Sequence, residues 1–120
     1  MPRSARGNRL KFDDLQEAWK AFNLDLENYY KHDRDKVFDS PMVLKRLKAK
    51  LQTIITVVEN EESAAEAGQL TASFEYMLHE RVLLHLLGYG KTNQPSGLLN
   101  LVLKFMVTLM VITKSQAVLI

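Results

Sequence analysis

The stretch from Leu98 to Ile112 is the most apolar part of the chain, with Asn100 and Lys104 among its few polar residues. At fifteen residues it is shorter than the about 20 largely uncharged residues that a membrane span needs. The composition therefore predicts a buried helix and not a membrane anchor. A helix that is apolar on nearly every side has to be covered on every side. Three other helices of similar length cover it only in part, so we expect additional chain or another molecule to complete the cover.

Two helices with one apolar face each are predicted before this segment. Steps of three and four residues define the apolar face of the first, at Phe12, Leu15, Trp19, Phe22, Leu26 and Tyr29 or Tyr30. Ser40 and Pro41 open the second helix, since serine caps a helix and proline suits its first position. Its predicted buried stripe is Leu44, Leu47, Leu51, Ile54 or Ile55, and Val58. The acidic run from Glu59 to Glu66 is predicted as a polar loop or a frayed extension of this helix.

A third helix is predicted from Gln69–Ala72 onward. Its apolar residues are Phe74, Met77, Leu78, Val82, Leu83, Leu86 and Leu87. Gly88 is placed to end it as a left-handed residue, and residues 89–97 are predicted as a connector in which Gly90 adds freedom. The last helix is predicted from about Ser96 to Thr113, and Ser115 to Ile120 look like the start of a further element.

The class predicted from these segments is all-α. Residues 1–11 are predicted as a flexible basic arm and residues 12–120 as a helical domain. Helices that bury their faces against successive neighbours are typical of an α-solenoid-like stack, so we expect residues 12–120 to be the N-terminal part of a longer stack. The alternative is a compact four-helix bundle that dimerises through its last helix and regulates another protein. No repeat period is visible to decide between the two.

Composition excludes several classes of function. The chain has no cysteine, which excludes disulfides, thiol catalysis and cysteine-ligated zinc. The net charge is only +2, and basic runs alternate with acidic ones, so a nucleic-acid partner is not predicted. The N-terminus has no apolar segment typical of a secretory signal, and we expect a cytoplasmic protein.

Catalytic and ligand-binding patterns are weak. Glu75 and His79 are four residues apart on one predicted helix, but His85 falls on the far side of that helix, which leaves a metal site one ligand short. The serines lie in caps and loops and not in a nucleophile motif. The segment from Gly88 to Thr92 follows a helix and lacks the spacing of a phosphate loop. We therefore predict no enzyme activity, no cofactor and no metal.

Four residues are candidate protein contacts. Tyr29 and Tyr30 are adjacent, so one ring has to leave the face that the other occupies, and exposed aromatic rings are common at binding hot spots. Lys45 and Lys48 belong to a basic run on the second helix. This run is either a solvated surface or a docking site for an acidic lipid or an acidic partner helix.

A series of motifs resembles the N-terminal region of the FTS- and Hook-interacting protein (FHIP) family. The series is Trp19, Tyr29–Tyr30, Leu47 to Ile55 ending at Glu61–Glu62, Phe74-Glu75-Tyr76-Met77-Leu78, and Pro95-Ser96-Gly97. It covers residues 12–120. Ser40 stands where the family pattern has an isoleucine before the proline, and Ser96 where it has a second proline. Family members are far longer than this chain.

The resemblance implies a role in holding other proteins together. Members of the FHIP family join FTS and Hook proteins and link dynein to endosomal vesicles through small GTPases of the Rab type. By resemblance, the chain is expected to be a non-enzymatic adaptor, cytoplasmic and peripherally associated with endosomes.

Overall fold

A computed structural model describes residues 10–31, 40–66 and 69–112. These residues form helices α2 (Phe12–Lys31), α3 (Ser40–Ala64), α4 (Ala72–His79), α5 (Val82–Thr92) and α6 (Leu98–Ile112), and no strand occurs in these three ranges. The all-α prediction is confirmed. The predicted arm, the connector after α2 and the segment after Thr113 fall largely or wholly outside the described ranges.

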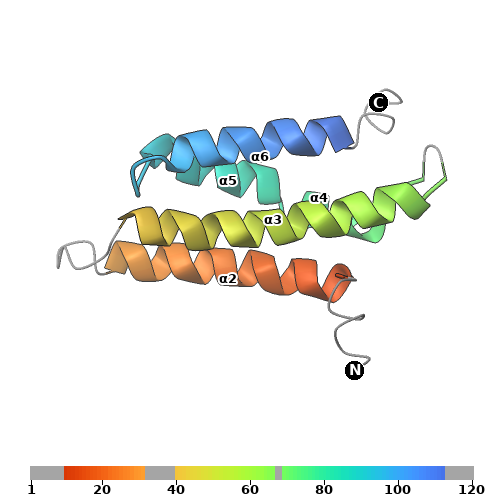
Figure 1. The fold of residues 1–120 in the computed structure, drawn as a ribbon, viewed down its shortest axis with the longest axis horizontal. Helices are drawn as coiled ribbons and strands as arrows, with labels where there is room; N and C mark the ends of the chain where they lie inside the picture. The colour runs from red at the N-terminus through yellow and green to blue at the C-terminus, as the bar shows by residue number, and fades with distance from the viewer. Residues whose placement is uncertain (1–9, 32–39, 67–68, 113–120) are drawn as a thin grey trace.

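The helices form four rods, each antiparallel to the next one along the chain (Figure 1). In Figure 1, α2, α3 and α6 lie one above another, and α4 and α5 lie behind them as a single broken rod. The rings of Phe12 and Tyr76 meet at 5.6 Å and those of Phe22 and Tyr89 at 6.2 Å, so the α4–α5 rod runs along α2. Helix α5 also packs on α6, and α6 on α3. The described rods thus enclose one core, an arrangement compatible with either a free bundle or the first layers of a stack.

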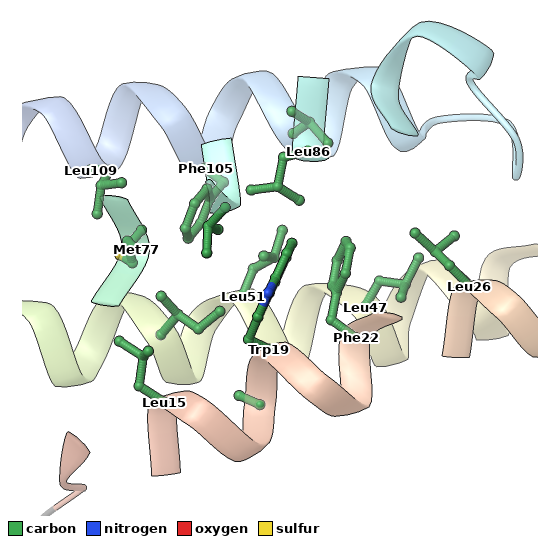
Figure 2. Packing of buried hydrophobic residues seen from close by; sticks show 14 of the residues in the cluster. Leu15, Trp19, Phe22, Leu26, Leu47, Leu51, Met77, Leu86, Phe105 and Leu109 are labelled. Atoms are coloured by element: carbon green, nitrogen blue, oxygen red, sulfur yellow. The ribbon is translucent and has the colours of Figure 1, made fainter. Parts of the chain in front are cut away.

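The core follows the predicted apolar stripes. Leu15, Phe22 and Leu26 of α2 are fully buried, and Trp19 stacks on Phe22 with ring centroids 5.6 Å apart. Figure 2 shows these side chains directed toward residues of α3, α4, α5 and α6. On α3 the predicted stripe is buried at Leu47, Leu51, Ile54 and Val58, while Leu44 and Ile55 pack at its edge. The periodicity of these two helices predicted the core because each has polar residues on its other side.

The segment predicted as the third helix forms two helices, and the break between them contains neither glycine nor proline. Helix α4 ends at His79, Arg81 takes a left-handed conformation with φ 55°, and α5 starts at Val82. Packing on both sides of the break holds this conformation, because Met77 before it and Val82 after it are both buried in the core. A left-handed non-glycine residue costs about 1–2 kcal/mol, so core packing outweighs local preference here.

The prediction that Gly88 ends this helix is wrong. Helix α5 continues to Thr92, and Asn93 takes the left-handed position with φ 49°. Asparagine tolerates that conformation, and its Oδ1 accepts hydrogen bonds from the backbone N–H groups of Gly97 (3.1 Å) and Leu99 (3.0 Å). The predicted connector at residues 89–97 is therefore helical through Thr92, and Gly90 is a helical packing position.

The acidic run after Glu59 is helical up to Ala64, as the second of the two predicted alternatives has it. The Glu61 carboxylate accepts two hydrogen bonds at the start of α4. The Ser73 N–H donates to Oε1 (2.9 Å) and the Ser73 hydroxyl donates to Oε2 (2.8 Å). Thr71 caps the same helix by accepting from the Phe74 N–H at 3.2 Å. Glu61 and Thr71 therefore fix the end of the α3–α4 loop that leads into α4.

Candidate partner-binding surface

Helix α6 is covered by the described residues on one side only. Leu98, Val102, Phe105 and Leu109 are buried, and Leu101 is half-buried. Leu103 is 47% exposed, Val107 60% and Met110 67%. The expectation that this chain's other helices cover α6 only in part agrees with the described residues. No helix in the described ranges has the length and apolarity to cross a membrane.

The uncovered apolar side of α6 is a regular line next to α5. Leu99, Leu103, Met106 and Met110 follow one another at steps of four, three and four, so they lie on one side of the helix. On α5, Leu83, Leu87 and Gly90 have the same spacing. A Cβ built on Gly90 would lie 3.4 Å from Leu99 Cδ1, so the two lines meet at this end of the hairpin.

We call this surface the α5–α6 face. It consists of Leu83, Leu87, Leu99, Leu103, Met106 and Met110, all exposed or half-buried. Val107 and Val111 extend it around α6 and are also exposed. Contiguous exposed apolar surfaces on soluble proteins commonly mark interaction sites. Helix α6 carries five exposed large apolar side chains, those of Leu99, Leu103, Val107, Met110 and Val111.

The charged residues within the α5–α6 hairpin have one sign. Residues 81–112 contain Arg81, Lys91 and Lys104 and no aspartate or glutamate. Lys104 follows Leu103 in the sequence, but it projects about 100° further around α6 and lines the groove between α6 and α3. Lys104 is therefore on the α3 side of α6 and not beside the line that faces α5.

Lys48, one of the predicted contact residues, lies at the α3 side of α6. A groove of about 180 Å³ separates the two helices and is lined by Lys48, Leu51, Gln52, Ile55, Leu101, Lys104, Phe105 and Thr108. No carboxylate is among these residues. Lys45 is exposed one turn earlier on α3. Lys50 is on the opposite side, with its Nζ 3.9 Å from Asp25 Oδ2 of α2, so the basic run is divided between two surfaces.

The tyrosine pair is divided as the sequence predicts. Tyr29 is buried and Tyr30 is 38% exposed, with the rings in edge contact at 5.8 Å. The Tyr30 hydroxyl donates to the Gln94 carbonyl at 3.0 Å. This bond ties α2 to the turn before α6, so the exposed ring also has a structural role. Its predicted role in binding stays a prediction.

A hollow of about 200 Å³ lies beside Tyr30, lined by Asn23, Leu26, Glu27, Tyr30 and Tyr89. Burial raises the pKa of the Tyr89 hydroxyl, and the nearby Tyr30 and Glu27 raise it further. Tyr89 donates a hydrogen bond to Asn23 Oδ1, so these two polar groups of the lining are paired with each other.

His79 and His85 are separated in the structure. His79 Nδ1 lies 3.4 Å from Glu80 Oε2, at the surface. His85 is on the next helix, where its ring meets Trp19 edge-on at 6.4 Å. No group of three or more potential metal ligands occurs in the part of the chain that the structure describes. Gly88 to Thr92, the segment compared with a phosphate loop, lies within α5.

The residues that sequence reasoning missed are the members of the apolar line on α6. A signal was present: Asn100, Lys104 and Thr108 form a polar line at steps of four, which marks one side of the helix as solvent-facing. The three remaining sides are apolar, and the sequence does not distinguish the side facing the core from the others.

No protein-family model matches the chain, and no solved structure matches it significantly. The geometry of the α5–α6 face is therefore the main structural argument about function.

Proposed function

We propose that the chain is a non-enzymatic adaptor that binds another protein through the α5–α6 face. The observation that supports this most directly is the line of exposed apolar side chains on α6. Removing such side chains from water is worth about 25 cal/mol per Å², and a partner helix would gain this energy on binding. Leu103 and Met110 are the most exposed members of the α5–α6 face.

By resemblance to the FHIP family, the proposed partners are FTS and Hook proteins, with a Rab GTPase as a further candidate. In that role the chain would belong to a complex that links dynein to endosomal vesicles, in the cytoplasm and peripherally on the endosome. Tyr29, Tyr30, Lys45 and Lys48 are the proposed additional contacts. Of these, Tyr30, Lys45 and Lys48 have exposed side chains, which is compatible with a contact role.

A pull-down of FTS and of Hook C-terminal segments with the purified chain tests this proposal. We expect capture by the wild-type chain and loss of capture with Leu103→Gln combined with Met110→Gln. The matched control is Leu24→Gln on α2, where an apolar side chain is 55% exposed outside the α5–α6 face. A full-length family member run in parallel establishes that the assay works. Absence of capture by the wild-type chain alongside capture by the longer protein rejects these partners.

The second candidate is a self-contained bundle that dimerises through α6 and regulates another protein. The observation that favours it is the single core enclosed by the described helices. Size-exclusion chromatography with light scattering separates the two candidates. A dimer that dissociates with Leu103→Gln favours the bundle, and a monomer favours the adaptor.

A further inference from the structure

We propose that the hollow between α2 and α5 beside Tyr30 binds a trimethylammonium group, as carried by a trimethylated lysine of a partner protein. We call it the Tyr30–Tyr89 hollow. It has a volume of about 200 Å³ and is lined by Asn23, Leu26, Glu27, Tyr30 and Tyr89. It shares no residue with the α5–α6 face, so the proposal goes beyond the adaptor function and does not depend on it.

Two tyrosines and a carboxylate come together in this hollow. Tyr30 and Glu27 belong to α2, and Tyr89 belongs to α5. Burial raises the pKa of the Tyr89 hydroxyl most, and Tyr30 and Glu27 are close enough to raise it further. Aromatic faces and a carboxylate both attract a cation, and aromatic cages recognise methylated ammonium groups in this way. The lining therefore favours a positively charged ligand.

Glu27 is available to such a ligand. Its side chain is exposed, and it makes no hydrogen bond or ion pair within residues 10–31, 40–66 and 69–112. Lys31, one turn further along α2, is not within ion-pair distance of it. No lysine or arginine lines the hollow. The negative charge of Glu27 is thus left for a cation that comes from outside.

The other polar side chains of the lining are already bonded. Asn23 Oδ1 accepts from the Tyr89 hydroxyl, and the Asn23 amide donates to the Trp19 carbonyl at 2.8 Å. The Tyr30 hydroxyl donates to the Gln94 carbonyl at 3.0 Å. An unmethylated ammonium has three N–H donors to satisfy. A trimethylammonium group has none and presents only methyl groups to the rings, so the hollow favours the methylated cation.

A choline lipid carries the same cation but is less suited to the hollow. Two carbons join its ammonium to a phosphate, so the phosphate would lie near Glu27, and like charges in proximity are unfavourable. No cation lines the hollow to offset that repulsion. A trimethyllysine carries four methylenes in place of the phosphate, and these are compatible with the apolar wall that Leu26 provides.

The first test compares three small probes on the complete chain, followed by NMR shifts of the Tyr30 and Tyr89 signals. They are choline, the uncharged alcohol in which carbon replaces the choline nitrogen, and ethanolamine. We expect choline to bind in the millimolar range and about tenfold more tightly than the other two. The alcohol lacks the charge and ethanolamine lacks the methyl groups, so each probe isolates one feature.

Four variants assign the binding to the lining. Tyr30→Leu removes one ring and should weaken choline binding about threefold, while Tyr30→Phe keeps the ring and should bind as wild type does. Glu27→Gln should weaken binding about threefold as well. The matched control is Glu17→Gln, an exposed glutamate of α2 outside the hollow. Thermal unfolding verifies the fold of each variant, and Glu27→Gln breaks no bond within the described residues.

The source of the cation is tested with a glycine–serine peptide that carries one central trimethyllysine, its unmethylated twin, and phosphatidylcholine vesicles. We expect the methylated peptide to bind about fivefold more tightly than its twin, and the chain not to sediment with the vesicles.

Four results would overturn the proposal. Choline causes no shift at Tyr30 or Tyr89; the uncharged alcohol or ethanolamine binds as tightly as choline; Glu27→Gln and Glu17→Gln have equal effects; or the chain sediments with the vesicles and does not distinguish the two peptides. The FTS and Hook pull-down judges the adaptor function separately, through residues that do not line this hollow.

Discussion

The Tyr89 hydroxyl of α5 donates a hydrogen bond to Oδ1 of Asn23 on α2, 66 residues earlier in the chain. The Asn23 amide in turn donates to the Trp19 carbonyl at 2.8 Å. The Phe22 ring lies against the Tyr89 ring next to this pair. The pair therefore fixes how α5 lies along α2, and through α5 it positions the α5–α6 face.

Tyr89→Phe should lower the free energy of unfolding by about 1–2 kcal/mol, because Asn23 Oδ1 is left without its donor in a half-buried site. A double-mutant cycle with Asn23→Ala should give a coupling energy of about 0.5–1.5 kcal/mol. Urea unfolding measures all four proteins. The matched control is Tyr30→Phe, whose hydroxyl bond to Gln94 is exposed and should cost less. A coupling energy of zero would show that the two side chains do not interact in solution.

Alkaline pH should destabilise the fold through Tyr89. Burial raises the pKa of its hydroxyl above the usual tyrosine value of 10.0, so the folded state holds the proton more tightly than the unfolded state. This contribution to stability is complete below the unfolded pKa and is lost as pH rises through the folded pKa. Burial and Glu80 shift the pKa of Tyr76 in the same direction.

The check is urea unfolding at about pH 8 and about pH 11. Tyr89→Phe with Tyr76→Phe should lose less stability than wild type over this interval, since neither phenylalanine titrates. An equal loss in the two proteins would place both hydroxyls in water-like surroundings.

Glu61→Ala should destabilise the protein by about 2–3 kcal/mol, since it removes both charge-assisted bonds to Ser73. Ser73 is fully buried, so water does not easily replace the lost acceptor. Hydrogen exchange of the α4 amides should accelerate more than that of α2. Glu59→Ala, an exposed residue on the same helix, is the control and should change stability by under about 0.5 kcal/mol. Equal effects of the two substitutions would contradict the role of Glu61.

The elements with one apolar face were predictable from the sequence. The stripes of α2 and α3 alternate with polar residues, so their periodicity identifies both the helix and its buried side. Gly88 misled the prediction because a glycine after an apolar run commonly ends a helix. Asn93 carries the same local signal five residues later, and only the fold shows that its side chain bonds to Gly97 and Leu99.

The candidate surface was predictable only in part. The excess of apolar residues on α6 predicted that the chain's other helices leave some of its surface uncovered, but the side left uncovered depends on where α3 and α5 pack. Lys48 was a candidate from its basic run, yet its place beside Lys104 is a tertiary relationship between residues 56 positions apart. No sequence pattern joins the two.

Gly88→Ala and Gly97→Ala should change stability in opposite directions. Gly88 is inside α5 and a Cβ there would meet nothing within 4 Å, so alanine should stabilise the helix by about 0.5–1 kcal/mol. Gly97 has φ +101° and a Cβ would lie 2.9 Å from Leu44 Cδ1. Alanine there is strained and should cost about 1–2 kcal/mol or more.

Thermal unfolding measures this pair, with a shift of about 4–8 °C expected for each kcal/mol in a domain of nearly this size. The two variants differ by the same added methyl group, so a difference in sign isolates the backbone setting of each glycine. A lower melting temperature for Gly88→Ala would mean that α5 ends at Gly88 in solution.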